Sequence, residues 1–548
     1  MSAKPIIIVG GGPVGMMLAL NLAALGTRSI LINSQTKPRW HPKGSTQNSR
    51  TMEHYRRLGI VDSIRSTGLP KSLPTDVTYF TRLSGYELAR LQMPSEQDKL
   101  AARGRAPADD QVVEPIFRCN QMHAEARIFE HVQACPLIDK RYGWDCVAWS
   151  EQPDGVTAEI VEAETGQREI VRGAYLAGCD GGHGIVRRQL GVGYLGETPT
   201  IQPYLGGPMV STYLRAPELA SIAGTNCWQY WIVNHDVRSN IVAVDGKTEF
   251  LFSTRLERPD QTPDDATIAA AFRASIGRDI KTEFIAHATW TAGQAFVAER
   301  FGQGRAWMAG DSVHLFTPTG GFGMNTGVDD AANLAWKLAG LAQGWGGPRL
   351  AESYETERRP IAFRNTGASK RLARNVGATP VSIDINDDTP AGIEARKKAH
   401  DYLSGGGPEF ASLGVQLGAR YDTSPIVIPD GAPPADDLFD YRPNGAPGGR
   451  APHVWIGEGR GIGDSIYDRF AHGFTVLRLG KTPQNVDAFV ASFKARGIPT
   501  AVLDVPNSVA RDLYERDIAI IRPDHHIAWR GNDCPPDADK VVGQIVGH

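Results

Sequence analysis

Apolar residues and glycines near the start of the chain predict a strand, a tight turn, a helix and a second strand. Residues 6–9 are β-branched, three glycines follow, and residues 14–25 are rich in Ala, Leu and Met before Gly26. A β-branched run is typical of a buried strand, and a glycine after an apolar run is typical of a helix end. With residues 28–32 as the next strand, the pattern indicates a βαβ unit.

Further along, the pattern of apolar positions changes to alternating strands. Runs at residues 227–233, 239–244 and 249–254 predict a mostly antiparallel sheet between about residues 203 and 288. Residues 306–309 predict a buried strand, and residues 329–340 predict a helix with one apolar side. From about residue 436 we expect a separate small α/β unit, with strands at 474–479, 500–503, 518–522 and 527–529 and a helix at 483–496.

Length and charge narrow the class of protein. The chain has 548 residues, enough for about three domains, and its net charge is −3. Nucleic acids and anionic membranes usually select a basic patch, so we expect neither as a partner. The uncharged stretch at residues 5–27 contains consecutive glycines and a proline that would break a spanning helix, so we expect no membrane span there.

The cysteines carry no recognisable framework. They stand at positions 119, 135, 146, 179, 227 and 534, without the spacing of a metal site or of a disulfide scaffold. We therefore expect no metal and a reducing, cytoplasmic location. The C-terminal unit lacks a Cys-x-x-Cys pair, so we expect no thiol–disulfide chemistry in it.

The turn after the first strand carries the pattern Gly10-x-Gly12-x-x-Gly15, with Pro13 at the helix start. In a dinucleotide fingerprint the first glycine allows the tight turn, the second lets backbone approach a pyrophosphate, and the third lets helix and strand pack closely. The fingerprint also expects an acidic residue after the next strand, to accept bonds from ribose hydroxyls. Asn33 stands there, and its amide oxygen can accept such a bond without a negative charge.

Two later segments place polar residues at the ends of predicted strands. Asp180 and Arg187 belong to residues 177–187, a strand end followed by a helix start. Asp311 follows the strand 306–309, and the glycine-rich loop 318–325 precedes the next helix. A carboxylate at a strand end can bind a polyol, and backbone N–H groups of such a loop can contact an electron-rich ring.

With these motifs in this order, the sequence resembles the group A flavoprotein monooxygenases, the single-component aromatic hydroxylases typified by para-hydroxybenzoate and phenol hydroxylases. The motifs cover residues 4–75, 110–195 and 285–365. Two positions depart from the family pattern, because Asn33 replaces a usual Glu and Gly184 stands where Ser is common. The FAD-binding residues that the resemblance implies are Gly10, Gly12, Pro13, Gly15, Asn33, Arg50, Gln121, Asp180, Arg187, Asp311, Gly320, Gly321, Gly323, Met324 and Asn325.

The resemblance also implies the fold class, which is α/β. We expect a Rossmann-like FAD-binding domain at residues 1–75, 110–200 and 289–390, and an inserted, mostly antiparallel β-sheet substrate domain at 76–109 and 201–288. A linker at 391–435 would lead to a thioredoxin-like α/β domain without Cys-x-x-Cys at 436–548. That last domain is expected to serve packing or to form a homodimer.

Candidate substrate residues come from one strand, two histidines and one loop. Trp228 and Tyr230 would share a face of the strand 227–233, which could cover an aromatic ligand or be plain core. His41 and His235 are candidate bases for a phenol, with ordinary surface positions as the alternative, whereas His314 is expected to be structural. The resemblance places Pro318 and Thr319 where flavin and substrate meet.

The activity that the resemblance implies is an FAD-dependent monooxygenase. It would use NADPH or NADH and O₂ to hydroxylate a phenolic substrate through a flavin C4a-hydroperoxide. A flavin halogenase is a weaker alternative, because residues 228–231 do not match the Trp-x-Trp-x-Ile-Pro signature of that class. A flavin oxidoreductase or a flavin-loaded accessory protein without hydroxylation is another alternative, and retention of the loop 318–325 argues against it.

Overall fold

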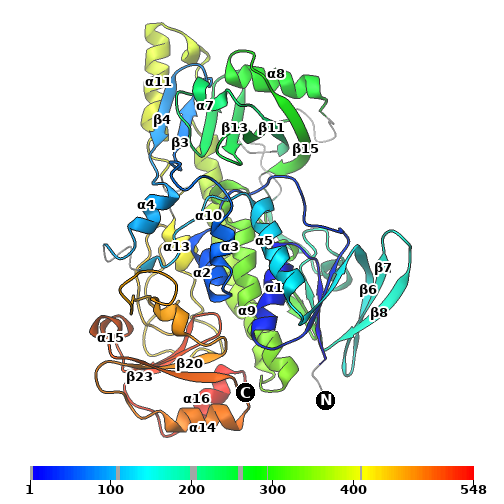
Figure 1. The fold of residues 1–548 in the computed structure, drawn as a ribbon, viewed down its shortest axis with the longest axis vertical. Helices are drawn as coiled ribbons and strands as arrows, with labels where there is room; N and C mark the ends of the chain where they lie inside the picture. Colours follow the sequence, from blue (N-terminus) through cyan, green and yellow to red (C-terminus); the bar gives the residue numbers. More distant parts are fainter. Residues whose placement is uncertain are drawn as a thin grey trace.

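The computed structural model describes residues 4–105, 111–197, 207–256, 263–292, 294–407, 410 and 412–548. A parallel sheet with long helices lies at the centre, a large sheet lies above it, and the C-terminal unit lies below (Figure 1). None of the helices in these ranges combines the length and apolar character needed to cross a membrane. The same ranges contain no group of three or more His, Cys, Asp or Glu that could hold a metal ion.

The central sheet has six strands in the order β17-β18-β9-β1-β2-β5. Its middle strand β1 (Ile6–Val9) is buried along its whole length and pairs in parallel with β2 (Ser29–Asn33) and β9 (Tyr175–Gly178). The helix α1 (Pro13–Ala24) connects β1 to β2, so the predicted βαβ unit is confirmed. The outer strands are β5 (Ile138–Tyr142), β18 (Ala306–Met308) and β17 (Gly302–Gln303).

Several helices pack against this sheet. The long helices α9 (Gly323–Gln343) and α10 (Arg349–Gly377) run through the middle of the molecule, with α9 against α1 (Figure 1). The apolar pattern predicted α9 but not α10, whose sequence mixes charged and apolar residues and contains Pro360. The remaining elements of this part are α2 (Ser49–Arg57), α3 (Val61–Arg65), α5 (Gln121–Ala134), α6 (Ile185–Gln189), β10 (Tyr194–Glu197), β16 (Ala295–Ala298) and β19 (His314–Leu315), and a separate antiparallel sheet of β6 (Trp144–Gln152), β7 (Gly155–Glu162) and β8 (Arg168–Gly173).

The upper sheet has seven strands in the order β15-β11-β14-β13-β12-β3-β4, and only the β12–β3 pair is parallel. The predicted mostly antiparallel sheet is therefore confirmed. Its strands are β3 (Val77–Phe80), β4 (Glu87–Leu91), β11 (Gly207–Arg215), β12 (Gln229–Val233), β13 (Arg238–Ala243), β14 (Glu249–Arg255) and β15 (Glu283–Ala292). The helices α4 (Glu96–Ala101), α7 (Leu219–Ile222) and α8 (Asp265–Ile276) belong to the same part of the chain.

The stretch 391–435, expected to be a linker, begins instead with a packed helix. The helix α11 (Pro390–Leu403) lies beside β4, and its Ala399 and Leu403 are buried in the core of the upper sheet. His400 Nδ1 also lies 2.7 Å from the carbonyl oxygen of Leu88. A second short helix, α13 (Leu413–Leu417), contacts α2. The first part of this stretch is thus a structural element, because its apolar side covers the sheet.

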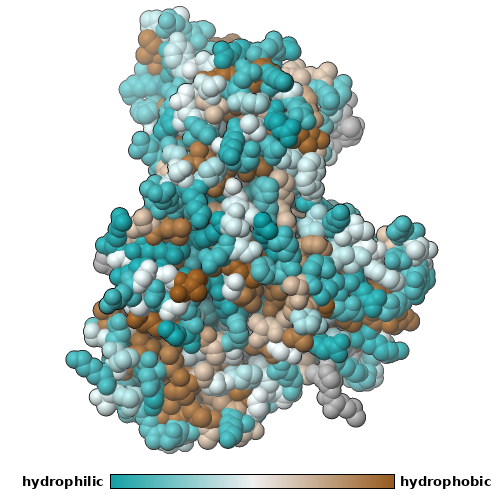
Figure 2. Space-filling view, viewed as in Figure 1, coloured by the Kyte–Doolittle hydropathy of each residue, from teal (hydrophilic) through white to brown (hydrophobic). Residues whose placement is uncertain are grey.

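The C-terminal unit contains the four predicted strands and the predicted helix. Its sheet has the order β21-β20-β22-β23, with β20 (Phe474–Leu479) parallel to β21 (Thr500–Val505) and antiparallel to β22 (Ile518–Ile521). The other elements are β23 (Ile527–Gly531), α14 (Asp487–Ala495), α15 (Ser508–Tyr514) and α16 (Ala538–Ile545). Apolar surface gathers at the lower left of the molecule, over this unit (Figure 2).

The C-terminal unit shares a buried core and a buried charge network with the long helices. Trp336 of α9 packs edge-on against Phe474 of β20, with the ring centroids 5.6 Å apart. Glu357 of α10 accepts hydrogen bonds from Arg522 at 2.7 and 2.8 Å and from Lys337 at 2.6 Å. Burial lowers the pKa of Lys337 to about 7, and burial alone would raise that of Glu357, but Arg522 and Lys337 hold the Glu357 pKa at about 2.

We expect this network to weaken in acid. The Glu357 pKa of about 2 lies below its ordinary value of 4.5, so its stabilising contribution is fully present above pH 4.5 and is lost as the pH falls toward 2. Relative to Glu357→Gln, the wild-type protein should lose about 2 kcal/mol of its advantage in free energy of unfolding between pH 7 and pH 3. Urea unfolding at both pH values measures this difference, and an advantage that does not change with pH would contradict it.

Candidate active site

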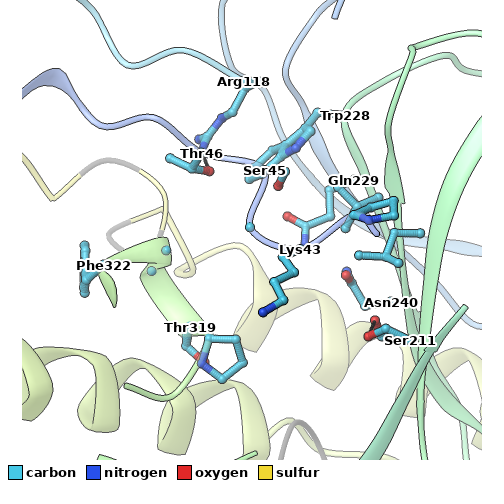
Figure 3. A pocket seen from close by; sticks show the side chains of 18 of the residues that line it. Lys43, Ser45, Thr46, Arg118, Ser211, Trp228, Gln229, Asn240, Thr319 and Phe322 are labelled. Atoms are coloured by element: carbon cyan, nitrogen blue, oxygen red, sulfur yellow. Dashed lines mark hydrogen bonds between the residues drawn. The ribbon is translucent and has the colours of Figure 1, made fainter. Parts of the chain in front are cut away.

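Two cavities meet at the start of α9. The polar cavity, of about 900 Å³, lies at the carboxyl ends of β1, β2, β9 and β18. The aromatic cavity, of about 470 Å³, lies between the upper sheet and the loop that precedes α9 (Figure 3). The residues that line both cavities are Arg39, Lys43, Gly44, Thr46, Pro318, Gly321 and Phe322. A group bound in one cavity can therefore contact a molecule in the other.

The glycine turn shapes one end of the polar cavity. Gly10 has φ +107°, and a Cβ on Gly15 would lie 1.9 Å from the carbonyl oxygen of Gly10, so the close packing of turn and helix requires both glycines. A Cβ on Gly12 would meet no atom within 4 Å, because Gly12 faces open space. Gly12 is the N-cap of α1 and offers no side-chain cap, so the first N–H groups of the helix are available to an anion. This end fits the pyrophosphate of a dinucleotide.

Asp180 and Asp311 both line the polar cavity, but only one of them is free of other bonds. The Asp180 carboxylate accepts hydrogen bonds from the Val186 N–H and from the Ser312 hydroxyl, each at 3.0 Å, and so fixes the start of α6. The Asp311 carboxylate accepts no hydrogen bond from the described residues, and desolvation raises its pKa. Asp311 is thus the carboxylate that a polyol entering this cavity would meet.

Asn33 lines the polar cavity and also holds the glycine turn. Its Oδ1 accepts a hydrogen bond from the Gly11 N–H at 3.1 Å, and its Nδ2 donates to the Gln35 carbonyl at 3.0 Å. Sequence reasoning gave Asn33 only the task of accepting a ribose hydroxyl. In the structure Asn33 also stabilises the backbone of the turn, through both the oxygen and the nitrogen of its amide.

Two predicted cofactor residues lie away from both cavities. Arg50 donates to Asp329 at 3.2 Å, to Glu53 at 3.1 Å and to the Asp524 carbonyl at 2.6 Å, so it joins α2 to α9 and to the C-terminal unit. Arg187 donates to the carbonyls of Val192 and Gly182 at 2.7 and 3.0 Å. Neither side chain is among the residues that line the two cavities, so their contact with the cofactor stays a prediction.

The remaining predicted cofactor residues gather at the expected place. Gln121 lines the polar cavity from the start of α5. Gly320 lines the aromatic cavity, Gly321 lines both, and the polar cavity is also lined by Pro13, Gly323, Met324 and Asn325. Asn325 fixes this loop, because its Nδ2 donates to the carbonyls of Gly321 at 2.6 Å and Thr46 at 3.0 Å. Backbone N–H groups at the start of α9 therefore face the polar cavity in a fixed arrangement, which fits the edge of a flavin ring.

The aromatic cavity is lined by rings from several elements. They come from Trp228, Trp231, Trp290, Phe322 and Phe410. Polar side chains stand between them, and Figure 3 shows Gln229, Asn240 and Ser211 along the wall formed by the upper sheet. Trp290 Nε1 donates to the Ser211 hydroxyl at 2.8 Å, which orients that ring. The cavity suits a flat aromatic molecule that carries polar groups.

The structure separates Trp228 and Tyr230, which alternation along the strand 227–233 would place on one face. Trp228 does line the cavity, but Tyr230 is fully buried in the core of the upper sheet, where its hydroxyl donates to the Thr225 carbonyl at 3.0 Å and accepts from the Cys227 N–H at 3.1 Å. Within β12 the alternation places Gln229 and Trp231 on the cavity side. Trp228 precedes the strand, so the alternation does not govern its direction.

The histidines separate into three environments. His235 lies outside both cavities, near Asp236, with a side chain that is 57% exposed, which is the surface position named as the alternative to a catalytic base. His41 lines the aromatic cavity, and burial lowers its pKa. His314 is buried and lies 2.6 Å from Asp330, which confirms the expected structural role.

Sequence reasoning missed the cations of the aromatic cavity, among them Lys43 and Arg118. Lys43 extends its amino group into the middle of the cavity (Figure 3), and burial lowers its pKa. Arg118 lies in the wall beside Trp228. Both residues stand in irregular segments, where periodicity gives no signal, and the only available signal was their position near motif residues.

Comparison with known proteins places the whole chain among flavoproteins. The family described as FAD binding domain matches residues 3–369, and the family described as aromatic-ring hydroxylase, C-terminal, matches residues 444–548. The chain is 29% identical to the FAD-dependent monooxygenase apdD of Emericella nidulans, over 99% of this chain and 90% of that protein. It is 27% identical to phenol 2-monooxygenase of a Pseudomonas species, over 99% of this chain and 92% of that protein. Among solved structures, chromopyrrolic acid-soaked RebC with bound 7-carboxy-K252c is similar with a TM-score of 0.88 and 30% identity, over 99% of both chains.

Proposed function

The chain belongs to the family of FAD-dependent aromatic-ring hydroxylases, and we propose that it hydroxylates a phenolic ring bound in the aromatic cavity, using NAD(P)H and O₂. The observation that carries this proposal is that the polar cavity, which the glycine turn borders, meets the aromatic cavity at Pro318, Gly321 and Phe322. Bound FAD supplies the redox chemistry, accepting hydride and activating oxygen. The tasks of the protein are binding, orientation and the exclusion of water.

Each part of the polar cavity has residues suited to one part of FAD. The first turn of α1, opened by Gly12, would hold the pyrophosphate, because helix N-termini favour anions. Asp311 would accept hydrogen bonds from the ribityl chain. The N–H groups of Gly323 to Asn325 would contact the isoalloxazine ring, and Asn325 keeps that loop in place.

On the substrate side, the chain positions a ring against the wall that the two cavities share. The rings of Trp228, Trp231 and Trp290 offer flat apolar surface and keep water from the reacting atoms. The ammonium group of Lys43 lies in the same cavity and favours the ionised form of a ring hydroxyl, which makes the ring more electron-rich. Pro318 and Thr319 set how closely the ring approaches the flavin.

A turnover assay tests this function. The purified protein should carry about one FAD per chain, since it has one fingerprint set, and a suitable phenol should accelerate its oxidation of NAD(P)H. Mass spectrometry should find that the product has gained one oxygen atom. If FAD binds but no member of a broad phenol panel accelerates oxidation or gains oxygen, the hydroxylase proposal fails.

Pro318→Leu should separate cofactor binding from hydroxylation. The added bulk projects into the space that the cavities share, so the substrate ring can no longer lie beside the flavin while FAD remains bound. We expect unchanged FAD content, with most NAD(P)H consumption yielding hydrogen peroxide instead of product. Pro483→Leu is the matched control, because Pro483 is exposed before α14. In this variant NAD(P)H consumption should remain coupled to hydroxylation. Efficient hydroxylation by Pro318→Leu would contradict this role of the loop.

Tyr230→Phe should affect stability and not catalysis. The substitution removes a buried hydroxyl with two backbone partners, so the free energy of unfolding should fall by about 1–3 kcal/mol. The rate and coupling of phenol hydroxylation should not change, because the ring faces the core of the sheet. Urea unfolding measures the stability and product analysis measures hydroxylation. A stable variant in which NAD(P)H oxidation is no longer coupled to hydroxylation would indicate that Tyr230 contacts the substrate.

Location and assembly are further parts of the proposal. All six cysteines are free in the structure, which supports a reducing compartment such as the cytoplasm. The C-terminal unit exposes Val490, Val502 and Val509, and we propose a homodimer through that unit. Sedimentation of the wild-type protein and of a variant with these three valines changed to Ser tests the dimer.

A further inference from the structure

Arg118 is a buried cation whose partners among the described residues are all neutral. Its side chain lines the aromatic cavity and the residue is only 4% exposed. The guanidinium donates to the Thr46 hydroxyl at 2.6 Å and to the Phe410 carbonyl at 3.4 Å. Its Nε donates to no atom of the described residues. Burying a charge costs free energy unless an opposite charge or several hydrogen bonds compensate for it, so this arrangement is incomplete.

The other buried arginines of the described chain do not share this feature. Each of them pairs with at least one carboxylate: Arg50, Arg56, Arg65, Arg358, Arg450, Arg522 and Arg530. Of all the buried arginines in the described residues, only Arg118 lacks such a carboxylate, and only Arg118 lines the aromatic cavity. The missing carboxylate is therefore expected from a molecule that enters the cavity.

The position of Arg118 is fixed before any ligand arrives. The residue follows Phe117, whose backbone pairs with that of Gln47 through hydrogen bonds of 2.8 and 2.9 Å. The guanidinium carbon lies 3.7 Å from the centre of the Trp228 ring, and Figure 3 shows Arg118, Thr46 and Trp228 together at one end of the cavity. A cation that is held on an aromatic face and anchored at two oxygens loses little further freedom when it binds an anion.

The charges that line the aromatic cavity also favour an anionic ligand. Its charged lining residues in the described chain are Arg39, Lys43 and Arg118, and none of its described lining residues is Asp or Glu. Burial lowers the pKa of Arg118 to about 9, so it remains charged at neutral pH but lacks compensation. A neutral phenol would leave that charge as it is, whereas an anionic ligand would neutralise it.

We propose that Arg118, packed on Trp228, is a binding residue for a carboxylate of the substrate, so that the preferred substrate is a phenolic aromatic acid instead of a neutral phenol. This inference rests on the proposed hydroxylase function. A guanidinium has five N–H donors in one plane, and the donors not used by Thr46 and Phe410 can bind a carboxylate. The substrate ring then lies among the cavity rings and is oriented by its acidic end.

A purely structural Arg118 would give a different result. Its bonds to Thr46 and Phe410 need only neutral donors, so a structural role affects the binding of acids and of neutral analogues equally. A carboxylate site affects only the acids. The ratio of the two affinities therefore separates the two roles.

The experiment measures that ratio with the FAD-loaded enzyme and matched pairs of probes. The pairs are 3-hydroxybenzoate with 3-hydroxybenzamide, and 3-hydroxy-2-naphthoate with its primary amide, and dissociation constants come from changes in flavin absorbance. In the wild-type protein at least one acid should bind about 10- to 100-fold more tightly than its amide. Arg118→Gln should remove this preference, and Arg118→Lys should retain part of it. Arg215→Gln is the matched control, because Arg215 lies on the exposed side of β11, and it should keep the full preference.

Several outcomes would overturn the proposal. One is a wild-type enzyme that binds each acid no better than its amide, and this result needs no variant to fold. Another is an Arg118→Gln variant that is folded, retains FAD and keeps the full preference. If neutral phenols are hydroxylated and acids are not preferred, the carboxylate site fails while the hydroxylase function stands. If acids bind through Arg118 but neither the probes nor any member of the phenol panel gains oxygen, the function fails while the site stands.

Discussion

Asp311→Ala is expected to produce a folded protein that loses FAD on dilution. The Asp311 carboxylate accepts no hydrogen bond from the described residues and opens into the polar cavity, so its removal breaks no hydrogen bond to them. It would remove an anionic acceptor for the hydroxyls of the cofactor, and such charge-assisted bonds correspond to about 10- to 100-fold in affinity. Fluorescence titration of the apoprotein with FAD measures this loss, and circular dichroism checks the fold.

Two controls make the Asp311 result specific. Asp311→Asn keeps an acceptor oxygen without the charge, so its affinity for FAD should lie between those of the wild-type protein and Asp311→Ala. Asp154→Ala removes an exposed carboxylate in the turn between β6 and β7 and should leave the affinity for FAD unchanged. Full FAD retention by Asp311→Ala would show that the backbone of the loops alone holds the cofactor.

Glu357→Gln is expected to have the largest effect on stability. The substitution leaves Arg522 and Lys337 buried without their shared carboxylate, and breaking a buried ion pair costs about 3–5 kcal/mol. Urea unfolding at neutral pH measures the loss. The control is Asp504→Asn in the exposed pair with Arg478, which should cost less than about 1 kcal/mol. A loss of similar size in both variants would contradict the importance of burial.

The same network determines how the C-terminal unit is attached. Arg522 and Asp524 come from that unit, whereas Glu357, Asn333 and Trp336 come from α9 and α10. Removing the unit would expose Trp336 and leave Glu357 without Arg522. A truncated chain should therefore lose stability throughout, including the start of α9 where the cavities meet. The C-terminal unit is therefore packed against α9 and α10, and a packing role is the one expected for it from its lack of Cys-x-x-Cys.

The sequence by itself determined the elements whose form depends on neighbouring residues. The βαβ unit, the glycine turn and the strands of the C-terminal unit follow from apolar periodicity and from glycines that only a tight turn needs. The order of three motifs was enough to indicate the family and the loop 318–325. These features are local, so a single sequence carries them.

Only the tertiary structure decided which side chains reach the cavities. Alternation shows that Tyr230 and Ile232 share a face, but the helix or sheet that covers each face decides which one borders the cavity, and that cover comes from distant parts of the chain. Arg50 matches a motif position, yet Asp329 and the Asp524 carbonyl, both far away along the chain, bind its guanidinium group. The case of Arg118 is the converse, because only the folded arrangement shows that none of the described residues gives this buried arginine a carboxylate. Electrostatic pairing acts through space, so it depends on the folded arrangement and not on position along the chain.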